Sequence, residues 1–352
     1  MTKNTIELAK KASKAEHIIE KLETCGYRAY IVGGAVRDMI LDESILDFDI
    51  VTDASLNEIQ AIFHLIHKKK KVKKVGSTFK ICIVNDIEVA ASRSDDLQSP
   101  FPENDLGKRD FTMNSMAYDL FSDRIIDPFS GQEDLKQRII RFTKSPEMRI
   151  KEDPLRMVRA CRFVSKIKGK IDPASLDAIK RHKDLIPEKV AMERIRLEIL
   201  KAMEYEKPSM FFQALHRTEL LEHIFPSLDR CFDLDGGPHH GETVFEHCML
   251  VGDALSPKKP LLRIAGYLHD AGKYDAAEFK DGKLTFPGHE KKKDKILADL
   301  KNLKFSREEI KYIDSIITVH MRPLTEKSTP KAIRRILVLL EKHQLSYHDF
   351  LR

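Results

Sequence analysis

Short apolar runs separated by helical patterns make up the first 140 residues of the chain. Each run has the length of a buried strand, too short for a helix. Asn85-Asp86, between the last two runs, predicts a tight hairpin turn. The runs occupy residues 29–32, 45–51, 79–84 and 87–91.

Segments with the apolar spacing of helices lie before and between these runs. Ser55 precedes one of them as a candidate N-cap. Strands that alternate with helices are typical of an α/β domain. The predicted helices are at 6–22, 35–41 and 56–66.

Beyond residue 142 the pattern is helical. Asp153-Pro154 marks a helix start, because aspartate caps helices and proline suits their first turn. Further helices are predicted at 192–203 and 211–225, and DLDGGP at 233–238 reads as a linker. We expect three domains, at 1–142, 143–232 and 233–352.

The composition is that of a soluble globular protein with more than one core. The chain has 352 residues, of which 42% are hydrophobic and 33% charged. No apolar run approaches the ~20 residues of a membrane span, and the N-terminus lacks the apolar centre of a signal peptide. We expect no membrane partner and a cytoplasmic location.

The five cysteines are scattered and lack CxxC spacing. We expect them to be buried thiols in a reducing cytosol, neither disulfides nor a zinc site. The net charge of +6 allows a polyanionic partner without proving one. KKKKVKK at 68–74 is either a solvated face or a track of phosphate contacts.

Candidate chemistry is concentrated in residues 30–53, YIVGGAVRDMILDESILDFDIVTD. Asp47 and Asp49 are two residues apart, so on a strand their carboxylates project from one face. A Mg²⁺ ion that also binds substrate phosphate oxygens would resolve their repulsion. Gly33-Gly34 before a helix offers backbone N–H groups to phosphate. Together these features predict a nucleoside-triphosphate site, with an ordinary turn and a solvated edge strand as the alternatives.

The motifs GGAVRD and LDFDIVTDA resemble the head domain of class II tRNA nucleotidyltransferases, the group of CCA-adding enzymes and bacterial poly(A) polymerases. The resemblance implies an α/β head with a five-stranded mixed sheet of the polymerase-beta-like kind, followed by an all-α neck and body. It continues in the family's order through RDFTMNSMAYD at 109–119, IDPFSG at 126–131, EDPLRMVRACRF at 152–163 and ERIRLEIL at 193–200.

This resemblance implies template-independent addition of nucleotides from CTP, with or without ATP as a second substrate, to the 3′ end of tRNA. Asp47 and Asp49 would hold two Mg²⁺ ions. Glu88, in EVA-x-x-R, matches the third carboxylate, and a glutamate facing water on an edge strand is its alternative. The alternative for Asp110 is a cap on a helix that begins near Thr112, which does not exclude a ligand role. The residues implied to bind triphosphate and ribose are Gly33, Gly34, Arg37, Arg109, Asp110 and Asn114.

EDPLR matches the family motif that reads the incoming base. A carboxylate accepts from the exocyclic amine of cytosine or adenine, and an arginine donates to their ring acceptors. The residues alone indicate only a helix cap at Asp153, and they allow Arg159 and Arg162 to be either phosphate ligands or solvated. Glu193 and Arg194, on the next helix, look structural. The candidates on this motif and its helix are Glu152, Asp153, Arg156, Arg159 and Arg162.

The segment between Arg93 and Arg109 is shorter than in typical CCA-adding enzymes by roughly ten residues. Lys108 also stands where the family has an arginine. In the family, a flexible loop here is the lever that switches the pocket from cytosine to adenine. The short segment therefore resembles that of CC-adding specialists, and we expect addition to stop after two C residues, with a separate enzyme adding the A.

Six of the 14 histidines lie in one stretch of the C-terminal third. A histidine on one helix, an adjacent His-Asp pair and a later histidine resemble the HD metal-dependent phosphohydrolase superfamily. Such ligands suit Mn, Ni, Fe or Zn. The final carboxylate of that pattern is not evident, although Asp314 and His320 lie nearby. A domain used only for packing or tRNA contact is the alternative. The predicted ligands are His247, His269, Asp270 and His289.

Three other functions remain open. A poly(A) polymerase shares every head motif and differs only in its product. A hydrolase whose head merely binds RNA would not need the DFD carboxylates. A non-catalytic RNA scaffold would fit the basic runs but not three clustered carboxylates.

Overall fold

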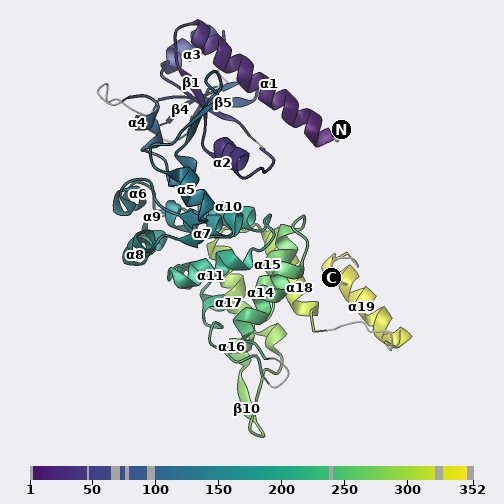
Figure 1. The fold of residues 1–352 in the computed structure, drawn as a ribbon. Helices are drawn as coiled ribbons and strands as arrows, with labels where there is room; N and C mark the ends of the chain where they lie inside the picture. Colours follow the sequence, from purple (N-terminus) through teal and green to yellow (C-terminus); the bar gives the residue numbers. More distant parts are fainter. Residues whose placement is uncertain are drawn as a thin grey trace. The chain divides into compact units, whose positions relative to one another are not determined.

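The computed structural model describes residues 3–45, 47–64, 72–75, 79–92, 100–237, 241–321 and 328–346. The chain divides into two compact units, each described here by itself (Figure 1). Unit 1 contains Met1–Lys151 and Lys170–Ser175, and unit 2 contains Glu152–Gly169 and Leu176–Arg352. The candidate carboxylates Asp47, Asp49 and Glu88 therefore lie in unit 1, and the EDPLR motif lies in unit 2.

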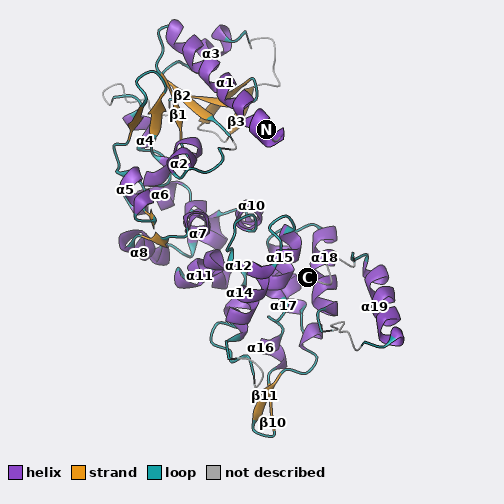
Figure 2. Cartoon of the chain, turned by 45° about the vertical axis from the view of Figure 1, so that its right-hand side comes forward, coloured by secondary structure: helices purple, strands orange, loops and turns teal. Residues whose placement is uncertain are grey.

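A mixed β-sheet forms the centre of unit 1 (orange in Figure 2). Its order is β3-β4-β5-β2-β1-β6-β7, and only β2 and β5 pair in parallel. Among the described residues it has seven strands, two more than predicted, since three-residue strands such as β6 and β7 carry no long apolar run. The strands are β1 (Ala29–Val32), β2 (Asp49–Thr52), β3 (Val72–Val75), β4 (Phe79–Val84), β5 (Ile87–Ala91), β6 (Ala117–Asp119) and β7 (Arg124–Ile126).

The helices of unit 1 confirm the predicted α/β class. The Ser55 hydroxyl accepts from Glu58 N, and the Glu58 carboxylate accepts from Ser55 N, which is a capping box at the start of α3. A short pair, β8 (Ile139–Ile140) and β9 (Lys170–Ile171), joins the two segments of the unit. The helices are α1 (Lys3–Thr24), α2 (Gly34–Ile40), α3 (Leu56–Ile62), α4 (Glu103–Leu106), η2 (Thr112–Asn114, a 3₁₀ turn), α5 (Gly131–Lys136) and α6 (Pro146–Glu152).

Two boundaries in unit 1 differ from the prediction. Strand β2 begins at Asp49, so Asp47 precedes it, whereas the apolar run predicted a strand from Ile45. The helix expected near Thr112 is a single 3₁₀ turn. The predicted hairpin turn at Asn85-Asp86 is confirmed, with both residues at positive φ.

A buried apolar cluster covers one face of the sheet. Tyr30, Val32 and Val51 form a buried cluster on one face with Leu106 and Ala117. Residues opposite one another on paired strands share a face. Because Asp49 pairs with Val32 and also with Glu88, both carboxylates lie on the face of this cluster, at its edge.

Unit 2 is almost entirely helical, as predicted for the neck, body and C-terminal region. A β-hairpin projects from it after α16 (Figure 1). Its elements are α7 (Leu155–Ile167), α8 (Pro173–Arg181, which starts in unit 1), α9 (Leu185–Lys189), α10 (Met192–Ala202), α11 (Ser209–Arg217), α12 (Leu221–Ile224), α13 (Pro226–Asp229), α14 (Val244–Ala254), α15 (Pro260–Leu268), α16 (Lys273–Ala276), β10 (Glu278–Lys280), β11 (Lys283–Thr285), η3 (His289–Lys291), α17 (Asp294–Asn302), α18 (Arg307–Val319) and α19 (Pro330–His343).

The single helix predicted over 211–225 is wrong. Helix α11 ends at Arg217, and Glu219 then adopts a left-handed conformation with φ 61°. That conformation closes a helix rather than continuing it. The apolar residues run on into α12 and α13, which are buried as well, so helical spacing alone did not reveal the break.

The described residues bear on two predictions, the lack of a membrane span and the state of the cysteines. None of the described helices is both long and apolar enough to cross a membrane. All five cysteines are free thiols, and four are buried as predicted. Cys25 is exposed just after α1, so the prediction of a buried thiol is wrong for that residue.

Candidate functional sites

Strand pairing brings two of the three predicted carboxylates together in unit 1. Asp49 and Glu88 lie opposite one another on the parallel strands β2 and β5. Asp49 also lies opposite Val32, at the end of β1. Strand β5 is flanked by β2 and β4, so the edge-strand reading of Glu88 is wrong. The Glu88 side chain is exposed, so both carboxylates border solvent at the end of β1.

Asp47, the third carboxylate, is open to solvent and paired with the N-terminal helix. Its side chain is 82% exposed, and Lys11 of α1 donates to Oδ1 at 2.9 Å. Lys14 makes a similar pair with Asp86 of the hairpin turn, at 3.3 Å. Exposed pairs of this kind contribute at most about 1 kcal/mol. A divalent ion can therefore displace Lys11 from Asp47 at small cost.

The backbone at Gly33 lies beside the Arg109 guanidinium and the Asp49 carboxylate. Its φ of +74° is one that side chains rarely adopt, and a Cβ there would lie 2.8 Å from Arg109 Nη1 and 3.8 Å from Asp49 Oδ2. The buried Asp105 holds the Arg109 guanidinium with distances of 3.2 and 3.3 Å. The site thus offers a carboxylate for a metal and a cation for phosphate beside an unobstructed backbone, with Gly34 starting α2 directly after it.

The other predicted nucleotide ligands of unit 1 form a buried network. Arg37 Nη1 donates to Asn114 Oδ1 at 2.8 Å, and Asn114 Nδ2 donates to Asp110 Oδ1 at 3.0 Å. Asp110 Oδ1 also accepts from Phe111 N at 2.9 Å. All three predicted ligands are less than 9% exposed. This network holds the segment after Arg109 against α2, and so it positions Arg109 beside Gly33.

In unit 2 the carboxylates of the EDPLR motif are paired with arginines. Arg156 donates to Glu152 at 2.7 Å. Arg194 of α10 holds Asp153 through both its Nη atoms, at 3.1 and 2.7 Å. Asp153 Oδ1 also accepts from Leu155 N at 3.3 Å, so it contributes to capping α7 as well. A two-point arginine–carboxylate pair fixes the plane of the carboxylate.

Arg162 is a packing residue between helices. It is buried, stacks on Phe163, and donates to Glu198 of α10 and to the Tyr205 hydroxyl. Its solvated reading is therefore wrong. Arg159 lies 3.9 Å from the same Glu198 and is partly exposed.

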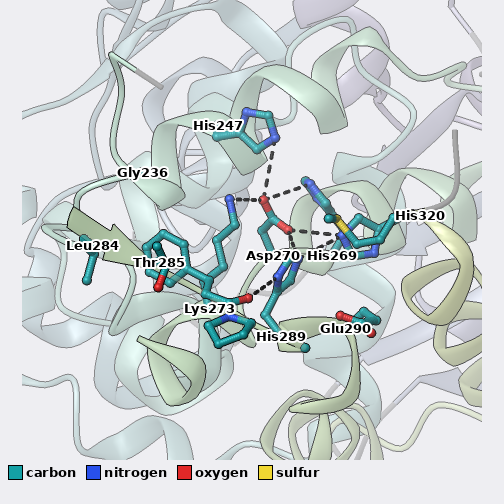
Figure 3. A pocket seen from close by; sticks show the side chains of 14 residues that line it. Gly236, His247, His269, Asp270, Lys273, Leu284, Thr285, His289, Glu290 and His320 are labelled. Carbon is teal, nitrogen blue, oxygen red and sulfur yellow. Dashed lines mark hydrogen bonds and ion pairs between the residues drawn. The ribbon is translucent and has the colours of Figure 1, made fainter. Parts of the chain in front are cut away.

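Four histidines of unit 2 converge on the carboxylate of Asp270, whose side chain is only 4% exposed (Figure 3). Oδ2 lies 3.7 Å from His247 Nε2 and 3.4 Å from His269 Nε2. Oδ1 lies 3.0 Å from His289 Nε2 and 3.2 Å from His320 Nε2. These five residues line a pocket of about 520 Å³. The four residues predicted as metal ligands thus lie together, and His320 joins them as a fifth.

The opposite ring nitrogen of each histidine is bound elsewhere. Nδ1 of His269 donates to Gly266 O at 2.7 Å, Nδ1 of His289 to Phe286 O at 3.0 Å, and Nδ1 of His320 to Ile317 O at 2.6 Å. Nδ1 of His247 donates to the Glu242 carboxylate at 3.2 Å. Carbonyl and carboxylate oxygens only accept, so each Nε2 is left as the nitrogen that faces Asp270. Metal-binding histidines are oriented in this way.

Asp270 and the histidines shift one another's pKa. Burial raises the pKa of Asp270, but hydrogen bonds from His269, His289 and His320 outweigh it and hold this pKa well below its usual range. Burial lowers the pKa of His289, yet its contact with Asp270 leaves the pKa above its ordinary value. Lys273 Nζ, 2.8 Å from Asp270 Oδ2, adds a further positive charge.

Three residues of these sites were not predicted as functional. His320 completes the cluster, whereas Asp314 pairs with Lys293. Lys273 follows the His-Asp pair by one helical turn, a spacing that could have indicated the contact. Arg194 reaches Asp153 across 41 residues, and no local signal marks such a pair.

The sequence matches two protein families. Residues 29–141 match the poly A polymerase head domain, and residues 170–232 match the probable RNA and SrmB-binding site of polymerase A. The first match contains Gly33, both DFD carboxylates, Glu88 and Arg109. The carboxylate site of unit 1 therefore lies inside a recognised head domain.

Relatives of two kinds match the same part of the chain. A CCA-adding enzyme of Lactobacillus helveticus is 37% identical over 224 residues, which are 60% of this chain and 55% of that protein. Poly(A) polymerase I of Salmonella typhi is 30% identical over 250 residues, 64% of this chain and 52% of that protein. The chain thus spans about half the length of the curated relatives that it matches.

Solved structures extend the likeness to nearly the whole chain. The Bacillus stearothermophilus CCA-adding enzyme in complex with CTP has a TM-score of 0.66 at 26% identity, covering 98% of this chain and 78% of that one. The Thermotoga maritima CCA-adding enzyme complexed with tRNA shares the fold, with a TM-score of 0.58 at 20% identity, over 95% of this chain and 77% of that one. The chain therefore belongs to the class II family of CCA-adding enzymes and bacterial poly(A) polymerases.

Proposed function

We propose that this chain adds cytidine nucleotides from CTP to the 3′ end of tRNA. The observation that carries the proposal is that Asp49 and Arg109 both lie beside Gly33 at the end of β1, with Glu88 opposite Asp49 on β5. Carboxylates for divalent metal and a guanidinium for phosphate are what transfer from a nucleoside triphosphate needs. The relative solved in complex with CTP supports this substrate.

The unit 1 residues fit Mg²⁺, because carboxylate oxygens are the ligands that this ion prefers. Asp47 and Asp49 would hold the ions, with Glu88 beside them. Bound Mg²⁺ supplies activation of the 3′-hydroxyl and stabilisation of the leaving pyrophosphate. In the reaction the 3′ oxygen bonds to the α-phosphorus, the bond to the β-phosphate breaks, and the hydroxyl proton leaves to solvent.

The chain's own residues orient the triphosphate. Arg109, fixed by Asp105, would contact its phosphates beside Gly33. Arg37 and Asn114 act through Asp110 as positioning residues, because their polar groups already bond to one another. Asp110 would also meet the ribose hydroxyls.

The base would be read in unit 2 by Glu152, Asp153 and Arg156. A carboxylate would accept from the N4 amine of cytosine or the N6 amine of adenine. Uracil and guanine carry an acceptor oxygen at that position, so they would be refused. The pair with Arg194 supports this role for Asp153, since it presents the carboxylate in one orientation. Arg159, partly exposed on α7, would contact phosphate, whereas Arg162 holds α7 in place.

The product is proposed to end after two C residues. The support comes from the sequence, where the segment before Asp105 is short and Lys108 replaces an arginine. Residues 93–99 of this segment lie outside the described part of the chain. A separate enzyme would then add the final A. The CCA-adding and poly(A) relatives define the alternatives, which are addition of the full CCA or of several A residues.

One assay tests the transfer and its product. Purified protein is given tRNA lacking its 3′ end with labelled CTP, ATP or both, and the product ends are sequenced. We expect two C residues on tRNA. Efficient A addition to tRNA ending in CC would contradict the CC-only product, and A tails on unrelated RNA would favour the poly(A) polymerase reading.

A second candidate function is favoured by the histidine cluster of unit 2. Imidazole and carboxylate ligands fit Mn²⁺, Ni²⁺, Fe²⁺ or Zn²⁺, and the Nε2 atoms around a buried carboxylate are the donor set such ions take. We infer a phosphohydrolase site of the HD type. Hydrolysis of p-nitrophenyl phosphate and its bis-ester by the metal-loaded chain tests this activity. No hydrolysis with any of the four ions would contradict it.

A further inference from the structure

We propose that Arg149 is a positioning residue for the triphosphate, because it fixes the turn that carries Arg109 through the carbonyl oxygen of Gly107. Arg149 itself does not contact the nucleotide. The inference deepens the first proposed function, nucleotide transfer in unit 1, and rests on it. All of the residues that carry the inference lie in unit 1.

A short turn sets the position of Arg109. Helix α4 ends at Leu106. The turn continues it, because the N–H groups of Gly107, Lys108 and Arg109 each donate to a carbonyl oxygen three or four residues earlier, at 2.9 to 3.1 Å. The buried Asp105 of the same helix holds the Arg109 guanidinium. A shift of this turn would therefore move the guanidinium and the carboxylate that holds it together.

The turn is tied to α6 by a buried arginine. The last carbonyl oxygens of a helix have no partner within the helix, so they need one from elsewhere. Nη1 of Arg149, on α6, donates to the carbonyl oxygen of Gly107 at 3.2 Å. Arg149 is only 4% exposed. A charged donor makes a strong hydrogen bond, and a buried charge without partners is costly, so this contact should be maintained.

Side chains also enclose the backbone of Gly107. A Cβ at this position would lie 2.7 Å from Nζ of Lys144 and 3.2 Å from Cζ of Phe129. Lys144 Nζ lies 5.8 Å from the centre of the Phe129 ring, so these two side chains are neighbours. Only a glycine leaves room for both of them at this distance. The turn is thus held by packing as well as by the hydrogen bond from Arg149.

Backbone pairing explains how α6 reaches the turn. Phe111 and Phe142 form an antiparallel bridge, with a hydrogen bond of 3.0 Å on either side of it. In antiparallel pairing the chain after Phe142 runs back past Arg109 toward Gly107. Helix α6 begins four residues after the bridge, and this brings Arg149 to Gly107.

The contact made by Arg149 should affect the phosphates and not the base. The turn places Arg109, which lies beside Gly33 and is the cation assigned to the phosphates in the proposed function. A guanidinium binds phosphate oxygens through donors in a fixed plane, so a small displacement weakens the contact. Loss of the hydrogen bond to Gly107 should therefore weaken binding of ligands that carry a pyrophosphate group and spare a nucleoside.

Ligand binding to the full chain in the presence of Mg²⁺ tests this selectivity. Calorimetry measures CTP and pyrophosphate, and ligand-observed NMR measures cytidine, which binds weakly. Arg149→Met keeps most of the side-chain volume and removes the donor. We expect it to weaken binding of CTP and pyrophosphate about tenfold and that of cytidine by less than about twofold. Lys151→Met, an exposed basic residue of the same helix, is the matched control and should change none of them.

Steady-state incorporation gives a second readout. With Arg149→Met, KM for CTP should rise by about the same factor as the dissociation constant, because the lost interaction binds the phosphates before and during the reaction alike. KM for tRNA should stay unchanged. A general loss of structure would lower kcat and alter both KM values, so the split between the two substrates identifies positioning.

A double-mutant cycle shows whether Arg149 acts through Arg109. In that case Arg149→Met weakens CTP binding no further in a chain that already carries Arg109→Ala. Arg149→Lys keeps a charged donor and should lose less CTP affinity than Arg149→Met. Thermal unfolding shows whether each variant is folded, and if Arg149→Met is not, Arg149→Lys enters the same cycle. Additive effects in the cycle, or equal losses for CTP and cytidine, would overturn the proposal.

The binding readout also separates this proposal from the transfer function. A wild-type chain that binds CTP without extending tRNA would contradict the transfer function, and Arg149 would still be judged by the binding of CTP and cytidine. A chain that extends tRNA, and whose Arg149→Met variant binds CTP as tightly as the wild type, would overturn the positioning role alone. A wild type that binds neither CTP nor pyrophosphate would overturn both.

Discussion

The carboxylate site of unit 1 and the histidine cluster of unit 2 both offer ligands for divalent metal, yet they are built in opposite ways. The Asp47 side chain is 82% exposed, and among the described residues it pairs with the half-buried Lys11. The Asp270 side chain is 4% exposed and surrounded by four histidines and a buried lysine. The unit 1 site is open and the unit 2 cluster is enclosed.

On the two proposed functions, this difference predicts how each site would use its metal. Exposed carboxylates bind Mg²⁺ weakly and leave most of its positions to water and substrate phosphate, so metal can arrive and leave with each nucleotide. Imidazoles that are already oriented by second hydrogen bonds bind transition ions tightly, and the ions stay through turnover. The sites should therefore respond differently to the same changes.

The largest effect is expected from removing a carboxylate of unit 1. Asp49→Ala should lower incorporation of CTP by about 10³-fold or more, because metal stabilisation of the reacting phosphate contributes several kcal/mol. Affinity for tRNA should hardly change. Incorporation rates and gel-shift binding measure both, and Asp86→Ala, an exposed carboxylate on the same sheet, is the control. Substantial turnover in Asp49→Ala would contradict the assignment.

Removing His269 and Asp270 from the histidine cluster should show that the two sites function independently. His269→Ala with Asp270→Ala should abolish tightly bound transition metal and any phosphatase activity, while CTP incorporation stays within about twofold of wild type. The ligand sets belong to different units, which is the reason to expect independence. Lost incorporation in a folded double variant would show instead that this region serves tRNA binding.

A smaller effect is expected at the base-reading pair. Asp153→Ala should weaken the rejection of UTP and GTP by about 1–3 kcal/mol, roughly 5- to 150-fold. Arg194→Ala should reproduce part of this loss, since Asp153 loses its orientation without losing its charge. Competition between CTP and UTP measures it, with the exposed Arg217→Ala as control. Unchanged selectivity would leave Asp153 as a helix cap.

The smallest effect is expected at Lys11, the lysine that pairs with Asp47 in unit 1. Lys11→Ala should lower the Mg²⁺ concentration needed for half-maximal incorporation by up to about fivefold, because an exposed ion pair contributes at most about 1 kcal/mol. Lys14→Ala, which frees Asp86 instead of Asp47, should leave it unchanged. A rise in the Mg²⁺ requirement would show that Lys11 assists catalysis.

Local patterns predicted much of unit 1 correctly. Strands β1, β4 and β5, the turn at Asn85-Asp86 and the cap at Ser55 are where the sequence places them. Each depends on interactions within a few residues. Strands β6 and β7 were missed, since three residues carry too little apolar pattern. The break at Glu219 was missed because buried residues continue across it.

The sequence by itself determined which chemical groups this protein offers. The DFD carboxylates, the Gly-Gly turn and the His-Asp pair are local motifs, and their residue types predict binding of metal ions and phosphates. Only the tertiary structure decided which of these groups meet. The register of β2 against β5 puts Glu88 opposite Asp49. The end of α18 carries His320 to Asp270, and α10 carries Arg194 to Asp153. Such contacts depend on how distant elements pack, and no spacing along the chain encodes them.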